Sequence, residues 1–319
     1  MTGDVGEVPG SAGVPALLRA ATERFAAAGL PSPRVDAEIL LAHVLRVPRS
    51  RLPLLDDPTV ELRATFERMV GRRAAGEPLQ HIIGRVVFRH SELLIGPGAF
   101  VPRPETELVA GAAIEYAASA ASTSGTTDQA GTAEKADTAD RAEVTVVDLG
   151  TGSGAIALAV STELAGARVY ACELDPDAYV WAERNLGGTG VHLVLDDLAV
   201  AFGELDGTVD VVVSNPPYIP LEAYEQVPAE VRLHDPAMAL WSGQDGLDAI
   251  RAVERTAARL LRPGGRVVVE HADQQGESAP AVFAASGSWS DVRDHPDLNS
   301  RPRFVTATRV GIRGAALSS

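Results

Sequence analysis

The 319-residue chain carries 43 acidic and 28 basic side chains, and its formal charge of −15 disfavours a large nucleic-acid-binding surface, which needs a basic face. Hydrophobic residues make up 45% of the chain, enough for a full core, and no apolar run reaches the ~18 residues of a membrane span. The single cysteine, Cys172, excludes an intramolecular disulfide and a cysteine-based metal cluster, and it fits a reducing compartment.

The first 78 residues have a helical pattern after a polar start. Residues 1–13 are acidic and glycine-rich, show no signal-peptide pattern and are expected to be disordered, which favours a cytoplasmic protein. Apolar residues then recur at helical spacing from Val14, again after Pro33, and from about 58 to 75. We therefore expect a small helical, substrate-docking domain over residues 14–78.

The pattern changes at residue 79. Short apolar runs separated by polar residues predict a β-hairpin connector over residues 79–101, followed by a second domain over residues 102–319. This domain opens with Pro102-Arg103-Pro104, where the two prolines hold Arg103 on an extended backbone. Arg103 belongs either to a rigid linker ahead of a helix or to the lip of a binding site, and the spacing leaves both open.

Residues 119–142 form a compositionally distinct segment. They are rich in Ala, Thr, Ser and Asp and contain no large apolar side chain. Such a segment buries too little surface to offset the entropy lost on ordering. We interpret it as a low-complexity insertion in the second domain.

The rest of the chain alternates strand and helix patterns. Seven segments are the expected strands: 144–149, 167–172, 191–195, 209–214, 266–270, 291–295 and 303–310. Helical patterns separate most of the first five, and the last two read as an antiparallel pair. This order predicts an α/β fold with a doubly wound, mainly parallel, seven-stranded sheet.

Candidate ligand-binding residues follow the first three of these strands, since ligands bind at the carboxyl ends of strands in open α/β sheets. The first strand runs into Gly150-Thr151-Gly152-Ser153-Gly154, where glycines let the backbone approach a ligand at a helix N-terminus. Glu173 ends the second strand, where a carboxylate accepts hydrogen bonds from both ribose hydroxyls. Asp197 and Leu198 follow the third, where an adenine edge would lie. Alone, the glycine turn could equally serve a dinucleotide, and Glu173 could be a solvated acid.

The fourth strand ends in Asn215-Pro216-Pro217-Tyr218. The side-chain carbonyl of Asn215 and the main-chain carbonyl of Pro216 could both accept hydrogen bonds from one NH2 group. That arrangement would draw the nitrogen lone pair out of conjugation and aim it at an electrophile. Tyr218 offers a flat face for a planar group. The alternative is a strand-terminating turn without chemistry. Because hydride transfer has no use for these residues, the sequence favours a methyl-donor site over a nicotinamide site.

These segments together resemble class I S-adenosylmethionine-dependent methyltransferases, and more narrowly the peptide chain release factor glutamine methyltransferases (PrmC/HemK family). The likeness spans residues 14–118 and 143–310. The motifs that carry it are 78–84, 102–107, 148–157, 214–219, 233–240, 270–277 and 301–304.

The resemblance implies methylation of the amide nitrogen N5 of the glutamine in the Gly-Gly-Gln motif of class-one release factors, which modulates translation termination. It implies S-adenosyl-L-methionine as cofactor and S-adenosyl-L-homocysteine as product. Because the sulfonium is a strong electrophile, no metal is required. Residues expected to contact the cofactor are Gly150, Thr151, Gly152, Ser153, Gly154, Glu173, Asp197, Leu198 and Asn215. Asn215, Pro216 and Tyr218 are the expected catalytic residues, and Pro217 and Arg103 join them as expected substrate-binding residues.

Two positions depart from the family pattern. Leu198 stands where an aromatic residue is common, so apolar packing would replace stacking on adenine, and the family lacks an equivalent of residues 119–142. The runner-up function is an adenine-amino methyltransferase on DNA or RNA, which shares Asn-Pro-Pro-Tyr but needs a basic groove. An idle cofactor-binding scaffold is a further alternative. We expect a monomer without a direct nucleic-acid or membrane partner, because the substrate is a loop on a large protein that must reach the strand ends.

Overall fold

The computed structural model describes residues 13–55, 57–124 and 143–311. The predictions for residues 1–12, and for 125–142 within the insertion, therefore lie outside the described residues. Two compact units make up the chain. The first comprises Met1–Gly84 and Ala229–His234, and the second comprises Arg85–Pro228 and Asp235–Ser319.

The first unit is helical. Its elements are α1 (Val14–Ala27), α2 (Pro33–Leu45), η1 (Arg49–Leu54), α3 (Val60–Ala74), α4 (Leu79–Ile83) and, from a distant part of the chain, α8 (Ala229–His234). Phe25, Leu40 and Phe66, one from each long helix, are fully buried in its core. Helix starts follow the sequence signals, since Pro33 opens α2 and the Thr59 hydroxyl accepts a hydrogen bond from the Leu62 amide ahead of α3. The predicted N-terminal helical region is confirmed.

The hairpin is shorter than the predicted connector over residues 79–101. Its two strands are β1 (Arg85–Phe88) and β2 (Ser91–Leu94), which pair antiparallel. The segment ahead of them, Leu79–Ile83, is the helix α4, and it ends at Gly84 with φ of 80°. The connector prediction was therefore wrong for residues 79–83, because a five-residue segment with three apolar side chains is too short to show whether its period is that of a strand or of a helix.

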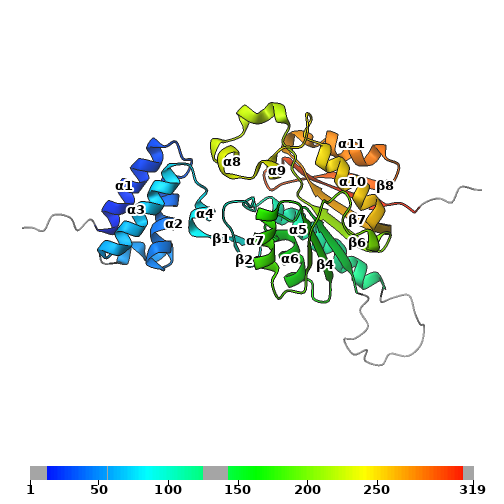
Figure 1. Ribbon diagram of the computed structural model, residues 1–319, viewed down its shortest axis with the longest axis horizontal. Helices are drawn as coiled ribbons and strands as arrows, with labels where there is room; N and C mark the ends of the chain where they lie inside the picture. The colour runs from blue at the N-terminus through cyan, green and yellow to red at the C-terminus, as the bar shows by residue number, and fades with distance from the viewer. Residues whose placement is uncertain (1–12, 56, 125–142, 312–319) are drawn as a thin grey trace, which may run out of the picture. The chain divides into compact units, whose positions relative to one another are not determined.

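The second unit is built on a seven-stranded sheet with strand order β5-β4-β3-β6-β7-β9-β8. Figure 1 labels β4, β6, β7 and β8 of this sheet. The strands are β3 (Thr145–Leu149), β4 (Arg168–Glu173), β5 (His192–Leu195), β6 (Val209–Ser214), β7 (Leu261–Glu270), β8 (Trp289–Pro296) and β9 (Pro302–Arg309). The first five strands pair in parallel, and β9 runs antiparallel to both β7 and β8. The predicted α/β, doubly wound, mainly parallel fold is confirmed.

Helices cover both faces of this sheet. On one face Val146 and Val211 pack with α5 (Thr106–Ser124), α6 (Ala155–Glu163) and α7 (Pro176–Leu186). Their neighbours Val147 and Val212 point to the opposite face and pack with α10 (Asp248–Leu260) and α11 (Ser278–Ala285). Strands buried on both faces read as the continuous apolar runs seen in the sequence. The short elements η2 (Gly203–Leu205), η3 (Leu221–Gln226), α9 (Ala237–Leu240) and η4 (Asp273–Gln275) lie in the loops.

Helix α5 continues to Ser124, so residues 119–124 are helical and do not belong to an unstructured insertion as predicted. Ala120 and Ala121 pack against the core, and the Ser119 and Ser122 hydroxyls donate to the Glu115 and Ala118 carbonyls of the preceding turn, which explains how the helix extends without large apolar side chains.

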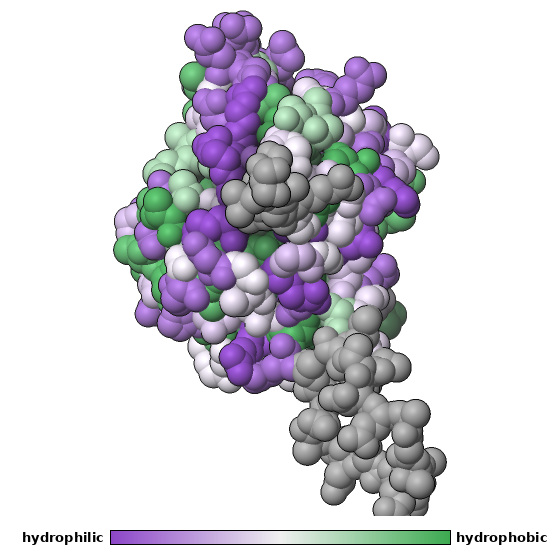
Figure 2. Space-filling model, turned by 90° about the vertical axis from the view of Figure 1, so that its right-hand side faces the viewer, coloured by the Kyte–Doolittle hydropathy of each residue, from purple (hydrophilic) through white to green (hydrophobic). Residues whose placement is uncertain are grey.

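The surface mixes residue types. On the face shown in Figure 2, hydrophilic and hydrophobic residues are interspersed. Among the described residues, no helix is long and apolar enough to cross a membrane.

Candidate active site

The glycine turn 150–154 and the segment Asn215–Tyr218 start from the neighbouring strands β3 and β6, at the point where the strand order reverses. β3 pairs with β4 on one side and with β6 on the other. The Ser214 hydroxyl donates to the Leu149 carbonyl at 2.6 Å, which ties the carboxyl end of β6 to that of β3. Ligands in open α/β sheets bind in the crevice at such a switch point. The glycine turn 150–154 and the segment Asn215–Tyr218 both begin there.

The glycine turn uses backbone conformations that favour glycine. Gly150, Gly152 and Gly154 have φ of 71°, 59° and 85°, in the left-handed region. The amides of Gly150 and Thr151 donate to the Cys172 carbonyl at 3.0 and 2.9 Å, which fixes the turn to β4. Gly154 is the N-cap of α6, so the turn presents its backbone at a helix N-terminus.

Asp148 supports this turn with one carboxylate oxygen and leaves the other without a partner. Its Oδ2 accepts hydrogen bonds from the Thr151 hydroxyl at 2.6 Å and the Ala157 amide at 3.1 Å. Its Oδ1 is buried and has no hydrogen-bond partner among the described residues. Burial raises the pKa of Asp148 to about 7, against the lowering effect of these two donors. A ligand with an ammonium group, such as S-adenosylmethionine, would satisfy Oδ1, so the residues present fit that cofactor.

Glu173 ends β4 and holds the backbone of two loops. Its Oε2 accepts from the Gly152 amide at 2.7 Å, and its Oε1 accepts from the Leu174 and Asp175 amides at 2.8 and 2.9 Å. Burial raises the pKa of Glu173, while these three amides oppose the rise. Carboxylate oxygens can accept more than one hydrogen bond each, so ribose hydroxyls would have to share the group with the glycine turn.

Asp197 and Leu198 lie in different surroundings. Asp197 is exposed, and its Oδ1 accepts a hydrogen bond from the Ala199 amide at 2.8 Å. Leu198 is half-buried against the core, and a Cβ placed on Gly150 would lie 3.7 Å from its Cδ2. The structure therefore brings Leu198 beside the glycine turn, whereas the Asp197 side chain serves its own local turn.

The Asn215 side chain is oriented by Thr106, the first residue of α5. Asn215 Nδ2 donates to Thr106 Oγ1 at 3.1 Å, and Thr106 is buried. The Thr106 hydroxyl in turn acts as a donor toward Glu270, because it lowers the pKa of that carboxyl by hydrogen bonding. These two hydrogen bonds direct the amide nitrogen of Asn215 toward Thr106, so its carbonyl oxygen is left to bind a ligand.

Tyr218 contacts the same buried carboxyl. Its hydroxyl donates to Glu270 Oε1 at 3.4 Å, and Glu270 lies at the end of β7 with 1% of its surface exposed. Burial and the charge of Glu270 raise the pKa of Tyr218, so the phenol stays neutral. Burial raises the pKa of Glu270 to about 7, opposed by the Thr106 hydroxyl and the charge of Arg303.

Arg103 is engaged by an acidic partner. Its Nη2 lies 3.0 Å from Asp235 Oδ2, and its guanidinium lies over the Phe100 ring, 4.9 Å from the centroid. The positive charge of Arg103 lowers the pKa of Tyr218, which places it in the electrostatic surroundings of the site.

Three residues of the site received no role from the sequence alone: Thr106, Glu270 and Gln275. In the sequence, Glu270 only ended the expected strand 266–270. The available signal is their place in the family motifs 102–107 and 270–277. No group of three or more potential metal ligands occurs among His, Cys, Asp and Glu in the described part of the chain.

Comparisons of the sequence with known proteins identify the family of this chain. The PrmC N-terminal domain model matches residues 16–84, and the methyltransferase small domain model matches residues 127–235. A release factor glutamine methyltransferase of Streptomyces coelicolor is 52% identical over 289 residues, 91% of this chain and 95% of that protein. The protein of the same name from Mycolicibacterium smegmatis is 44% identical over 295 residues, 92% of this chain and 96% of that protein.

A third relative carries a different name. The 4-amino-L-phenylalanine/4-methylamino-L-phenylalanine methyltransferase of Streptomyces pristinaespiralis is 40% identical over 294 residues, 91% of this chain and 94% of that protein. The matches cover nearly the whole chain, including the N-terminal helical unit. The chain therefore belongs to the release factor glutamine methyltransferase family.

Proposed function

We propose that this protein methylates the side-chain amide nitrogen N5 of the glutamine in the Gly-Gly-Gln motif of class-one release factors. S-adenosyl-L-methionine is the methyl donor, S-adenosyl-L-homocysteine the product, and translation termination the process modulated. The observation that carries the proposal is the hydrogen bond from Asn215 Nδ2 to Thr106, which leaves the Asn215 carbonyl oxygen at the switch point of the sheet. Release factors act at the ribosome, so the reaction belongs in the cytoplasm.

The chemical problem is a weak nucleophile. The lone pair of a glutamine amide nitrogen is delocalised into its carbonyl group. When bound, S-adenosylmethionine supplies a methyl group on an electrophilic sulfonium. The Asn215 carbonyl and the Pro216 main-chain carbonyl then accept hydrogen bonds from the two N–H groups of the glutamine. These acceptors orient the nitrogen in line for displacement and stabilise the positive charge that develops on it.

Tyr218 and Pro217 complete the proposed glutamine site without acid–base chemistry. The Tyr218 phenol is neutral and bonded to Glu270, so its ring serves as a packing surface for the planar amide. The proton of the methylated nitrogen is acidic enough to leave to water. Arg103, which pairs with Asp235, is proposed to contact the substrate from the segment ahead of α5.

The proposed cofactor site combines the glycine turn with the ends of three strands. Asp148 Oδ1 and the backbone of residues 150–154 would hold the amino acid part of the cofactor. Glu173 would accept hydrogen bonds from the ribose, and Asp197 with Leu198 would line the adenine. Asn215 would contact the cofactor from the opposite side of the switch point.

The proposal is tested by methyl transfer with matched substrates. Purified release factor is incubated with the enzyme and methyl-tritiated S-adenosylmethionine, beside the same factor with the Gly-Gly-Gln glutamine changed to alanine. A third sample contains 4-amino-L-phenylalanine, because an aromatic amine also has its nitrogen lone pair in conjugation and a 40% identical relative is named for that substrate. Further samples contain DNA and ribosomal RNA.

Label on the release factor that disappears with the glutamine substitution supports the reaction, the substrate and the position together. Label on 4-amino-L-phenylalanine alone would replace the protein substrate by a small aromatic amine. Label on nucleic acid alone would move the assignment to the adenine-amino methyltransferases.

A further inference from the structure

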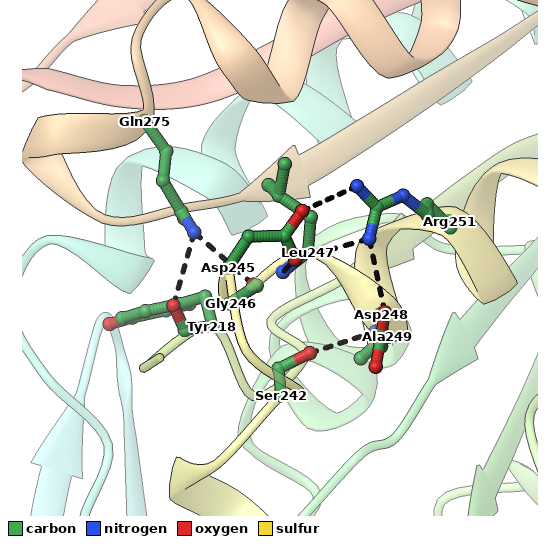
Figure 3. Close-up of polar contacts among 9 residues, drawn as sticks. All are labelled: Tyr218, Ser242, Asp245, Gly246, Leu247, Asp248, Ala249, Arg251 and Gln275. Carbon is green, nitrogen blue, oxygen red and sulfur yellow. Dashed lines mark hydrogen bonds and ion pairs between the residues drawn. The ribbon is translucent and has the colours of Figure 1, made fainter. Parts of the chain in front are cut away.

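Gln275 is a buried amide outside the proposed substrate and cofactor residues, and every hydrogen-bonding group of its side chain is used. It ends η4, just after β7, and 5% of its surface is exposed. Its Nε2 donates to the Tyr218 carbonyl at 3.1 Å and to the Gly246 carbonyl at 3.2 Å (Figure 3). Its Oε1 accepts from the Ala272 amide at 3.0 Å. A carboxylate or an apolar side chain at this position cannot make the two donor bonds.

The carbonyl that Gln275 holds belongs to the last residue of the Asn215–Tyr218 segment. The Tyr218 hydroxyl is held separately by Glu270, at the end of the same strand β7. Tyr218 is therefore fixed at two points, its main chain by Gln275 and its phenol by Glu270. Neither contact can be replaced by water without opening buried structure, since Gln275 and Glu270 are both almost fully buried.

Gly246 brings a second loop against the same carbonyl. Its φ is 76°, and a Cβ at this position would lie 2.5 Å from the Tyr218 carbonyl oxygen and 2.8 Å from Gln275 Nε2. Only a residue without a side chain allows this approach. The Tyr218 carbonyl, the Gln275 amide and the Gly246 backbone thus form one close-packed contact.

The loop that carries Gly246 is braced at the start of α10 (Figure 3). Arg251 Nη2 lies 2.6 Å from Asp245 Oδ2, and Arg251 Nη1 lies 3.0 Å from Asp248 Oδ1. The Ser242 hydroxyl accepts a hydrogen bond from the Ala249 amide at 2.8 Å. The two ion pairs are exposed, so the buried Ser242 hydroxyl is the main tie of this loop to α10, and Gln275 joins the loop to the segment that follows β6.

We propose that Gln275 is a positioning residue for methyl transfer, which sets the placement of the Asn215–Tyr218 segment by binding the Tyr218 and Gly246 carbonyls together. This inference rests on the proposed function for the identity of the reaction. Gln275 is not one of the residues proposed to contact the glutamine or the methyl donor, so it acts through the position of Tyr218 and of the acceptors at Asn215 and Pro216. A displaced acceptor lowers the rate of the chemical step more than it weakens binding of either substrate.

The test compares Gln275→Glu with Gln274→Glu. The two substitutions are chemically identical and adjacent in sequence, but Gln274 is exposed. Gln275→Glu is expected to lower the single-turnover rate of release-factor methylation by about tenfold to a hundredfold. Its Kd for S-adenosylhomocysteine is expected to change much less than the transfer rate, because Asp148, the glycine turn and Glu173 are proposed to hold most of the cofactor and none of them is a hydrogen-bond partner of the Gln275 side chain. Gln274→Glu is expected to match wild type in both measurements.

A second variant keeps the test decisive if Gln275→Glu folds poorly. Gly246→Ala pushes on the same carbonyl while Gln275 is intact, so it is expected to lower the transfer rate with cofactor binding retained. The double variant is expected to lose less than the product of the two single losses, because both act on one contact. Multiplicative losses, or equal losses in rate and in cofactor binding, would overturn the positioning role.

A readout independent of the reaction separates this inference from the proposed function. Tyrosines are replaced by 3-fluorotyrosine, and the fluorine resonance of Tyr218 is assigned with Tyr218→Phe. Gln275→Glu is expected to shift or broaden that resonance, and Gln274→Glu is expected to leave it unchanged. An unchanged Tyr218 resonance in Gln275→Glu would refute the inference. Absence of release-factor methylation by the wild type would refute only the function.

Discussion

Asn215 depends on Thr106 for the orientation of its amide. The Thr106 hydroxyl accepts from Asn215 Nδ2 and donates toward Glu270, so one buried hydroxyl fixes which end of the Asn215 side chain faces the site. Full removal of the acceptor in Asn215→Ala would cost on the order of 10²–10³ in kcat, by analogy with oxyanion-hole residues. Loss of the orienting hydroxyl alone should cost less, because the acceptor remains present.

We therefore predict that Thr106→Val lowers kcat about tenfold, which corresponds to about 1.4 kcal/mol, near the value of one buried hydrogen bond. Valine keeps the shape of threonine and removes the hydroxyl. Thr106→Ser keeps the hydroxyl and is expected to retain most of the activity. The measurement is steady-state methylation of the release factor at saturating cofactor. Equal activity of the valine and serine variants would show that Asn215 does not need this partner.

Glu270 is predicted to make stability depend on pH. The pKa of the folded protein's Glu270 is about 7, raised by burial above its ordinary value of 4.5. Between these values the folded protein keeps a proton that the unfolded chain has released. The free energy of unfolding should therefore fall as pH rises from about 4.5 to about 7, by on the order of 3 kcal/mol for this group.

The measurement is urea unfolding of wild type and Glu270→Gln between pH 5 and pH 8. The neutral amide removes the titration, so the variant is expected to gain stability relative to wild type as pH rises. Burial also raises the pKa of Asp148 to about 7, but that group is common to both proteins and cancels in the difference. Parallel pH profiles for the two proteins would contradict the prediction.

At the scale of elements, a sequence pattern predicted the secondary structure correctly where the pattern is compatible with only one kind of element. The β-branched runs of β3 and β6 are buried on both faces, and the glycines after β3 occupy conformations that other residues avoid. The same reasoning failed at Leu79–Ile83, a five-residue segment too short for the spacing of its apolar residues to distinguish a helix from a strand. The positive φ of Gly84, a common helix-ending conformation, is what ends that helix.

Helices α2 and α3 are joined by a buried ion pair. Arg73 Nε lies 2.7 Å from Asp36 Oδ2, and both side chains are less than one-tenth exposed. Arg73 Nη1 also donates to the Glu77 carbonyl and lies 2.9 Å from Glu230 on α8, so this guanidinium connects three segments of the first unit. Removing Asp36 leaves the buried Arg73 with Glu230 and the Glu77 carbonyl as its partners but leaves its Nε without the Asp36 acceptor.

We predict that Asp36→Ala lowers the stability of the first unit by about 2–3 kcal/mol, the value of a lost hydrogen bond between charged groups, because Glu230 still compensates part of the Arg73 charge. The double variant Asp36→Leu/Arg73→Met should recover most of that loss, because it replaces the buried charges by apolar side chains of similar size. Far-UV circular dichroism during urea unfolding measures the effect. The tryptophans, Trp181, Trp241 and Trp289, all lie in the second unit and report it separately. A double variant as unstable as Asp36→Ala would mean that the pair contributes net stability.

At the scale of the whole molecule, the place of the site was predictable, but its supporting residues were not. Asn215 and Tyr218 follow a strand directly, so chain order puts them at the edge where ligands bind. Their partners come from far away in sequence: Thr106 precedes Asn215 by 109 residues, and Glu270 and Gln275 follow Tyr218 by 52 and 57. Such contacts exist only once the sheet is assembled, so no local spacing encodes them.

The composition of the proposed site also predicts the oligomeric state of the protein. The glycine turn, Glu173 and the Asn215–Tyr218 segment all belong to the second unit of a single chain, so the proposed site needs no residue from another copy. The proposed substrate is a glutamine on a loop of a large protein, and such a substrate requires open access to the strand ends. We therefore predict a monomer whose specific activity does not depend on enzyme concentration.

Light scattering on a sizing column should give a mass near 33.4 kDa, and methylation per mole of enzyme should stay constant from about 10 nM to 10 μM. The net charge of −15 also favours the monomer, because like-charged copies repel one another at low ionic strength. Raising the salt concentration tests that contribution, since screening removes the repulsion without changing any site contact. A dimer mass together with specific activity that rises with concentration would contradict the prediction, and it would imply that a second copy completes or orders the site. A dimer with constant specific activity would contradict the prediction of a monomer, but it would not contradict the proposal that one chain supplies the whole site.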